Sequence, residues 1–215
     1  MSTTAEVNIG QDVQHDEHHD HEQSFISKYI FTTDHKMIGK QFLVTGIMWG
    51  LIGVGMSVIF RLQLGFPDMD LGWLRPLLGG WISEAGKLDP EFYLALVTMH
   101  GTIMVFFVLT AGLSGTFSNY LIPLQIGARD MASGFMNMLS YWFFFLSSVV
   151  MMSSIFIETG PAAGGWVVYP PLSALPQAIQ GSGLGMTLWL VAMVFFIVSM
   201  LLGGINYITT VINLR

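Results

Sequence analysis

Long uncharged segments separated by short polar stretches dominate the chain. Four of them are 20 residues or longer, namely 41–60, 92–128, 131–157 and 159–214. A helix that crosses the hydrocarbon core of a bilayer needs about 20 mostly apolar residues. The pattern therefore predicts four transmembrane helices, near 40–61, 92–117, 136–157 and 185–212.

Helices are favoured over strands because a backbone in lipid must satisfy its polar groups within the segment. A membrane β-barrel would alternate apolar and polar residues, and these segments do not. Composition agrees: 53% of residues are hydrophobic, 10% are charged, and the mean hydropathy is +0.61. Soluble domains are closer to one quarter charged. We predict an all-α, polytopic membrane helix bundle with about four transmembrane helices.

The chain contains no cysteine, which excludes disulfides and thiolate metal sites. The eight Lys and Arg residues are unevenly placed around the predicted helices. Five fall on the N-terminal side of the membrane: Lys28, Lys36, Lys40, Arg129 and Arg215. Arg61, Arg75 and Lys87 fall on the other side. Because cytoplasmic loops carry an excess of these residues, this bias predicts a cytoplasmic N-terminus.

The polar segments suggest how the chain is organised. Residues 1–24 alternate histidine with carboxylates in "DVQHDEHHDHE", and such acidic polar tails are usually solvated, so we predict a disordered tail. Residues 25–215 form the predicted membrane domain. The stretch 62–91, with Trp73 and Trp81, predicts an ordered excursion along the interface. The stretch 158–184, rich in Gly and Pro, is expected to pack over the outer face.

One histidine, His100, lies within the second predicted helix. Ionisable residues inside membrane spans are candidates for function. From the residue alone, three interpretations stay open. His100 could bond another helix, relay protons in a transporter, or bind haem iron through a neutral imidazole.

Other candidates also have simple structural interpretations. Gly46 and Gly50 form a GxxxG pair, which allows close contact between helices or leaves room for a flat cofactor. Asp130 precedes the third helix. A negative charge at the start of a helix stabilises that helix by about 0.3–1 kcal/mol. Arg61 could extend its guanidinium to the interface, and Trp166 could anchor there.

Several motifs in order resemble one family. They are "TTDHKMIGKQF", "VIFRLQLGFPD", "TMHGTIMVFF", "GTFSNYLIPLQIGARDMASGFMNMLSYW", "GGWVVYPPL" and "GGINYITTVINLR". Over about residues 31–215 the chain resembles subunit I of the haem–copper respiratory oxidases. The resemblance implies a terminal oxidase that reduces O2 to water and pumps protons. It implies cytochrome c or a quinol as electron donor, other oxidase subunits and membrane lipid as partners, no nucleic acid, and location in a bacterial inner membrane.

The resemblance also implies roles for residues near the second helix. His100 matches the ligand of a low-spin haem, expected to be haem A, and Gly101 beside it leaves space for the porphyrin. Arg61 matches an arginine that contacts the formyl group of this haem. Trp166 matches a tryptophan near the propionates of a second, high-spin haem.

A second set of matches concerns protons. Asp130 matches the mouth of a proton-conducting water path, and Asn119, Asn137 and Asn206 match asparagines along it. Phe42 stands where many members have a tyrosine lining this path. Gln63 replaces an acidic residue that helps some members bind Ca²⁺ or Na⁺, so we predict no such site.

The remaining centres of such an oxidase are not encoded here. Four of the six histidines lie in the tail, which leaves His35 and His100. These residues cannot supply the ligands of the high-spin haem and the copper, so we expect the 215 residues to be the N-terminal third or more of subunit I. The alternative from another class is a haem-free transporter with His100 and Asp130 as proton relays. Within the family, a nitric oxide reductase is the less favoured possibility.

Overall fold

The computed structural model describes residues 25–157 and 159–215, so the predicted disordered tail, 1–24, lies outside the described residues. The chain divides into two compact units, at Phe31 and Thr32. In the first unit, the short helix α1 (Phe25–Tyr29) brings the rings of Phe25 and Tyr29 within 4.9 Å of one another.

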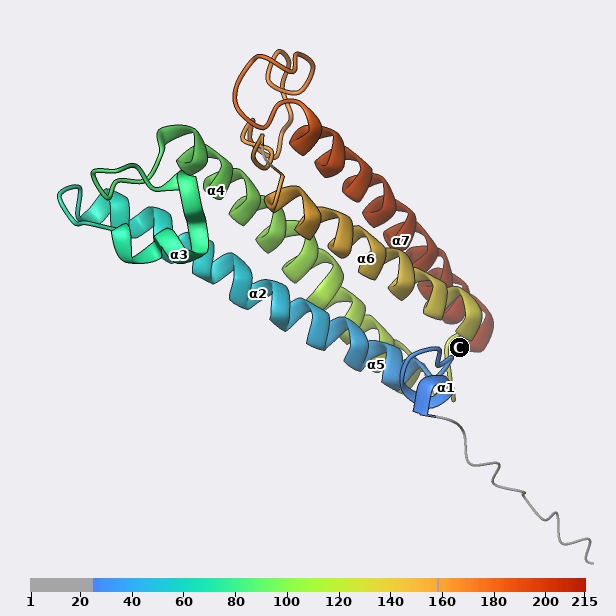
Figure 1. Cartoon of the computed structure of the whole chain (residues 1–215). Helices are drawn as coiled ribbons and strands as arrows, with labels where there is room; N and C mark the ends of the chain where they lie inside the picture. Colours follow the sequence, from blue (N-terminus) through green and yellow to red (C-terminus); the bar gives the residue numbers. More distant parts are fainter. Residues whose placement is uncertain (1–24, 158) are drawn as a thin grey trace, which may run out of the picture. The chain divides into compact units, whose positions relative to one another are not determined.

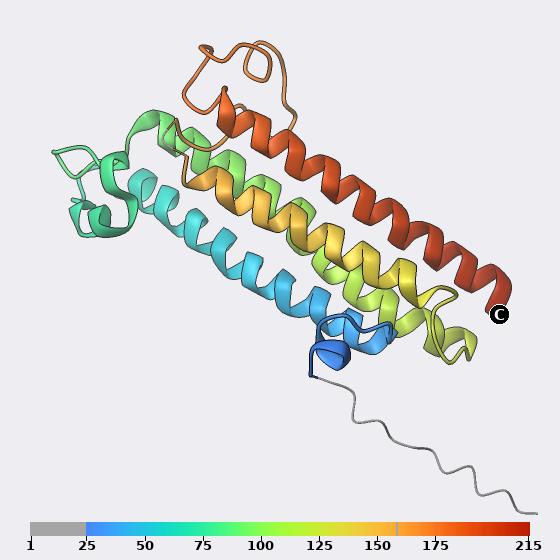
Figure 2. The ribbon, with the colours of Figure 1, turned by 45° about the vertical axis from the view of Figure 1, so that its right-hand side comes forward.

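The second unit is built from long helices. Four of its helices are long and apolar enough to cross a membrane, which confirms the predicted fold class. They are α2 (His35–Gly65), the continuous helix Pro90–Ile126, α6 (Gly134–Ile155) and α7 (Leu184–Leu214). The continuous helix consists of α4 (Pro90–Thr102), η3 (Ile103–Leu113) and α5 (Ser114–Ile126). Figures 1 and 2 show these four long helices side by side in one bundle.

Local capping explains where the helices begin and end. The side chain of Asp34 accepts a hydrogen bond from the Met37 N–H, so α2 begins at His35, five residues before the predicted start. Asp89 caps α4 in the same way, followed by Pro90 in the first turn. At the end of α5, Gly127 adopts φ +75°, a left-handed conformation that glycine adopts without steric cost. The second helix thus continues to Ile126, beyond the predicted end at 117.

Aromatic side chains fill the centre of the bundle. Phe42 of α2 stacks on Phe144 of α6 with ring centroids 5.4 Å apart. Phe107 of η3 lies 5.8 Å from Phe144 and 5.2 Å from Trp49 of α2. All four side chains are fully buried. They connect three of the long helices, because each large ring contacts a neighbour on another helix.

The middle of the second span is a π-helix, Ile103–Leu113. The Thr110 hydroxyl donates to the Val105 carbonyl, five residues back, at 2.8 Å. Such segments are rare and occur frequently at functional sites. The apolar pattern of these residues gives no sign of the wider helix, and the π-helix begins only three residues after His100.

Glycines allow α2 to approach this π-helix closely. A Cβ atom added to Gly46 would lie 2.8 Å from the Gly112 Cα, whereas one added to Gly50 would lie 3.9 Å from the nearest Val108 methyl carbon. Gly46 therefore serves contact between helices rather than contact with a flat cofactor. Of the GxxxG pair, only Gly46 is at backbone contact distance.

Two connecting segments cover one end of the bundle (Figure 1). The first contains η1 (Gly72–Leu74), α3 (Arg75–Leu78) and η2 (Gly79–Trp81). This segment is therefore folded into short helices, which agrees with the prediction that it is ordered. Gln63 of α2 holds this segment through both ends of its amide. Its Oε1 accepts from the Leu88 N–H at 2.9 Å, and its Nε2 donates to the Pro67 carbonyl at 3.5 Å. The ammonium of Lys87 donates to the same carbonyl. In the second segment, the Gly165 N–H donates to the Thr98 hydroxyl of α4 at 3.0 Å.

We expect Gly46→Ala to destabilise the bundle, because its methyl group would push the α2 backbone away from Gly112. Overpacking of this kind costs about 1–3 kcal/mol. Gly50→Ala is the matched control, since its methyl group meets only ordinary contacts. Thermal unfolding in detergent, followed by circular dichroism, should show a lower midpoint for Gly46→Ala alone. Equal midpoints for the two variants would contradict the close contact.

Candidate functional site

The imidazole of His100 bridges two helices. His100 lies near the end of α4 and is partly buried. Its Nδ1 lies 2.8 Å from the carbonyl oxygen of Gly53 in α2. The ring of Phe60, also in α2, meets the imidazole edge-on with centroids 5.6 Å apart. The bond to Gly53 is the interhelical contact expected of a structural histidine.

That bond also decides the tautomer of His100. A carbonyl oxygen only accepts hydrogen bonds, so Nδ1 carries the proton and Nε2 keeps its lone pair. Within residues 25–157 and 159–215, Nε2 has no hydrogen-bond partner. Histidines that bind metals usually donate their other N–H to a carbonyl or carboxylate in this way. The arrangement therefore fits an imidazole prepared to bind a metal ion through Nε2.

The neighbours of His100 leave room on one side and place a charge nearby. A Cβ atom added to Gly101 would have no neighbour within 4 Å, so the backbone there is open to a bulky group. The guanidinium carbon of Arg61 lies 5.0 Å from the centroid of the Phe60 ring. Because Phe60 also contacts His100, Arg61 belongs to the same cluster. We call Gly53, Phe60, Arg61, His100 and Gly101 the His100 site.

Trp166 lies on the connecting segment rather than in this cluster. Its ring centroid is 5.7 Å from that of Phe106 in η3, and half of its surface is exposed. The neighbouring Gly165 is fixed to Thr98 of α4. Trp166 is therefore held against the second span, with one face open to groups outside the described chain.

A ladder of buried hydrogen bonds fixes the rotation of α4 around His100. The indole N–H of Trp189 in α7 donates to the Thr102 hydroxyl at 3.1 Å, and this hydroxyl donates to the Thr98 carbonyl at 2.9 Å. Thr98 and Thr102 lie two residues before and after His100. Since both are buried and bonded, the turn that carries His100 cannot rotate without breaking these contacts.

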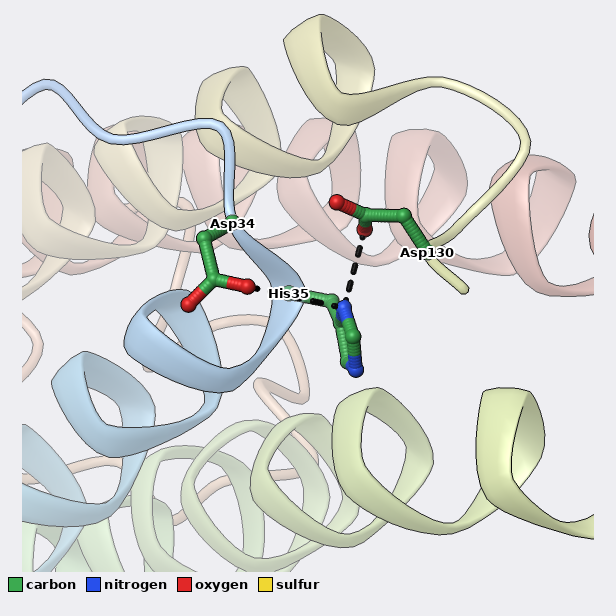
Figure 3. Close-up of side chains that lie close together, drawn as sticks. All are labelled: Asp34, His35 and Asp130. Carbon is green, nitrogen blue, oxygen red and sulfur yellow. Dashed lines mark hydrogen bonds and ion pairs between the residues drawn. The ribbon is translucent and has the colours of Figure 1, made fainter. Parts of the chain in front are cut away.

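A second cluster lies at the opposite end of the second span, where α2 begins. Figure 3 shows His35 turned toward Asp130, with Asp34 beside it. Nδ1 of His35 is 3.0 Å from Oδ1 of Asp130 and 3.7 Å from Oδ1 of Asp34. His35 is buried, whereas Asp130 is partly exposed. We call these three residues the Asp130 site.

Asp130 does not cap the helix that follows it. The cap of α6 is Ser133, whose hydroxyl oxygen accepts from the Met136 N–H at 3.2 Å. Asp130 instead accepts from the Met131 N–H at 2.7 Å and from His35. The carboxylate is therefore fixed by its own backbone and by an imidazole, between solvent and the interior of the bundle.

Two of the predicted asparagines meet directly. Nδ2 of Asn137 in α6 donates to Oδ1 of Asn119 in α5 at 2.5 Å, and both side chains are fully buried. Nδ2 of Asn119 donates to the Gly115 carbonyl at 2.7 Å and contacts the Tyr207 hydroxyl at 3.4 Å. Among the described residues, Oδ1 of Asn137 has no hydrogen-bond donor. We call Asn119 and Asn137 the asparagine pair.

Asn206 has different partners. Its Oδ1 accepts from the Ser133 N–H at 3.0 Å, and its Nδ2 donates to the Ser133 carbonyl at 3.1 Å. Thr210, one turn later, accepts from the Ala132 N–H at 2.9 Å. Asn206 thus holds the segment that carries Asp130.

Several residues around these sites were not predicted as site residues, among them His35, Tyr207 and Trp189. His35 is separated from Asp130 by 95 positions and Tyr207 from Asn119 by 88, so only the packing of helices brings them together. Only a weak signal for these contacts is present in the amino-acid sequence. Asp34, Asp130 and Ser133 each border a predicted helix on the same side, which indicates that the residues around them share one end of the bundle.

Comparison with known proteins gives consistent matches. The model of a family described as cytochrome c and quinol oxidase polypeptide I matches residues 37–215. The alternative cytochrome c oxidase subunit 1 of Bradyrhizobium diazoefficiens is 40% identical over 195 residues, which cover 91% of this chain and 30% of that protein. Cytochrome c oxidase subunit 1 of Cereibacter sphaeroides is 36% identical over 213 residues, covering 92% of this chain and 37% of that protein. The chain thus spans 30% to 37% of the length of these two relatives.

We expect Thr102→Val to weaken the attachment of α4 to α7. The valine would leave the buried indole N–H of Trp189 without an acceptor, and an unsatisfied buried donor costs about 1–3 kcal/mol. Thr209→Val is the control, because the Thr209 hydroxyl makes the same bond four residues back, to the Ile205 carbonyl, and has no indole partner. Thermal unfolding should separate the two variants. The ladder would lose its proposed importance if both unfolded at the same temperature.

Proposed function

Because this chain belongs to the family of subunit I of the cytochrome c and quinol oxidases, we propose that it forms part of a membrane enzyme that reduces O2 to water. Electrons would come from cytochrome c or a quinol, and turnover would drive protons across the membrane. The observation that carries the proposal is the state of His100, with Nδ1–H bound to the Gly53 carbonyl and Nε2 free for iron.

A low-spin haem bound at the His100 site would supply reversible one-electron transfer. His100 would hold the iron through Nε2, and the bond to Gly53 would keep the imidazole in the required tautomer and orientation. The open side of Gly101 supports contact with a flat ring. Among the described residues this cluster offers one nitrogen ligand for iron, Nε2 of His100, so any further protein ligand would come from elsewhere in the oxidase.

Arg61 would set the electrostatics of that haem. Its guanidinium carries a fixed positive charge, and charge near the iron tunes the potential of the group. The contact of Arg61 with Phe60, and of Phe60 with His100, supports this role. The planar donors of Arg61 also suit the formyl oxygen of haem A. Trp166, half exposed beside η3, would meet the propionates of a second, high-spin haem. The ligands of a copper centre would also come from outside this chain.

The Asp130 site would admit protons. Asp130 is partly exposed, so its carboxylate can exchange protons with the aqueous phase. His35 would hold this carboxylate in place through Nδ1, at 3.0 Å. Asn206 would fix the surrounding segment through Ser133. The asparagine pair lies in the interior, and neutral amides orient water without trapping the proton.

The exposed apolar side chains of the bundle and the placement of its charges support a membrane setting. Apolar side chains such as Leu51 and Ile197 are 71% and 60% exposed, which supports lipid or other oxidase subunits as neighbours. The excess of Lys and Arg at the end that holds Asp130 supports a cytoplasmic N-terminus and proton uptake from the cytoplasm of a bacterial cell.

We expect His100→Ala to remove the low-spin haem from the assembled oxidase, because the other described histidine, His35, lies at the opposite end of the second span. The reduced-minus-oxidised optical spectrum should lose the band of that haem. His35→Ala is the control and should retain it. A haem-free transporter would show no such bands in any variant. An unaltered low-spin band in assembled His100→Ala protein would contradict the ligand assignment.

We expect Asp130→Asn to assemble and bind haem normally but to turn over slowly. An asparagine accepts a hydrogen bond but cannot release and regain a proton. O2 consumption should fall at least about tenfold, which corresponds to about 1.4 kcal/mol on the rate-limiting barrier. Oxygen electrode and proton release measurements on vesicles check this. Normal consumption with normal proton release would show that Asp130 has only a structural role.

A further inference from the structure

Tyr207 of α7 reaches across the bundle to the asparagine pair. Its hydroxyl oxygen lies 3.4 Å from Nδ2 of Asn119 in α5. A Cβ atom added to Gly203, one turn earlier in α7, would lie 3.6 Å from this hydroxyl and 3.8 Å from the Ser140 hydroxyl. The absence of a side chain at Gly203 therefore leaves space where the hydroxyls of α6 and α7 approach the pair.

The hydrogen bonds around Asn119 define what the Tyr207 hydroxyl can do. The Asn119 amide nitrogen has two hydrogens, one of which is bound to the Gly115 carbonyl. The other points to the Tyr207 oxygen, which therefore acts as an acceptor. The hydroxyl hydrogen of Tyr207 then remains available, and within the described residues it has no acceptor.

Asn137, the other member of the pair, has an unpaired acceptor in the described residues, where Tyr207 has an unpaired donor. Oδ1 of Asn137 is buried and accepts no hydrogen bond from the part of the chain that the structure describes, while Nδ2 of the same side chain is bound to Asn119. Buried polar atoms in native proteins nearly always have a partner, either a protein group or an ordered water. The Ser140 hydroxyl cannot supply the missing hydrogen, because it donates to the Asn137 carbonyl at 2.8 Å.

We infer that Tyr207 is a positioning residue of the proton path, and that its hydroxyl donates to a water molecule that in turn donates to Oδ1 of Asn137. One water would satisfy both groups and would be oriented by both. Buried waters typically make two to four such bonds. A phenol is neutral at physiological pH, so it would orient the water without binding the transferred proton. The inference rests on the proton path proposed above.

Tyr207→Phe tests this inference in the assembled oxidase, because it removes only the hydroxyl. Tyr141→Phe is the matched control. It removes another tyrosine hydroxyl, whose partner is the Thr45 hydroxyl of α2 at 3.1 Å rather than an amide of the pair. Tyr207→Phe should lower O2 consumption at least about threefold with unchanged haem bands, and Tyr141→Phe should not lower it.

Two comparisons separate the possible results. In an Asp130→Asn background, Tyr207→Phe should cause no further loss, because both changes act on one path. An equal loss in both backgrounds would overturn the inference, as would turnover equal to that of Tyr141→Phe. Loss of haem bands in Tyr207→Phe would show that the hydroxyl is structural, which also overturns it. If Asp130→Asn itself turns over normally, the proposed proton entrance fails, whatever Tyr207→Phe does.

Discussion

The hydrogen bond between His100 and the Gly53 carbonyl is the interaction on which the proposed chemistry depends. It joins α2 to α4 at 2.8 Å and leaves Nε2 as the free nitrogen of the imidazole. The surrounding packing maintains it. Gly46 brings α2 against the π-helix, and the Thr102 ladder fixes the turn that carries His100. Removing either support would move the imidazole relative to its carbonyl partner.

The bundle separates two kinds of chemistry along its length. His100 lies near the start of the second span and Asn119 near its end, with the π-helix between them. The environment of His100 is aromatic and carries one guanidinium. The other end gathers a carboxylate, an imidazole, neutral amides and a phenol. Because the same helices supply both ends, the His100 site and the Asp130 site are held in fixed relation by one apolar core.

Much of this arrangement could be predicted from the sequence. The uncharged segments predicted four spans, and the motifs around His100 and Asp130 predicted the family, because hydropathy and motif order are local properties of the chain. The contacts that complete the clusters could not be predicted in the same way. His35 meets Asp130, and Tyr207 meets Asn119, only after the helices have packed. The π-helix was also missed, since its residues are as apolar as those of an ordinary span.

The most direct test of iron binding by His100 is a high-resolution structure of the intact subunit with its cofactors, obtained by electron microscopy in lipid. We expect Nε2 of His100 to bind the iron of a low-spin haem, while Nδ1 remains hydrogen-bonded to the Gly53 carbonyl. The porphyrin ring of this haem should lie against the open side of Gly101. A haem bound elsewhere, with both nitrogens of His100 engaged by protein groups, would contradict the central claim.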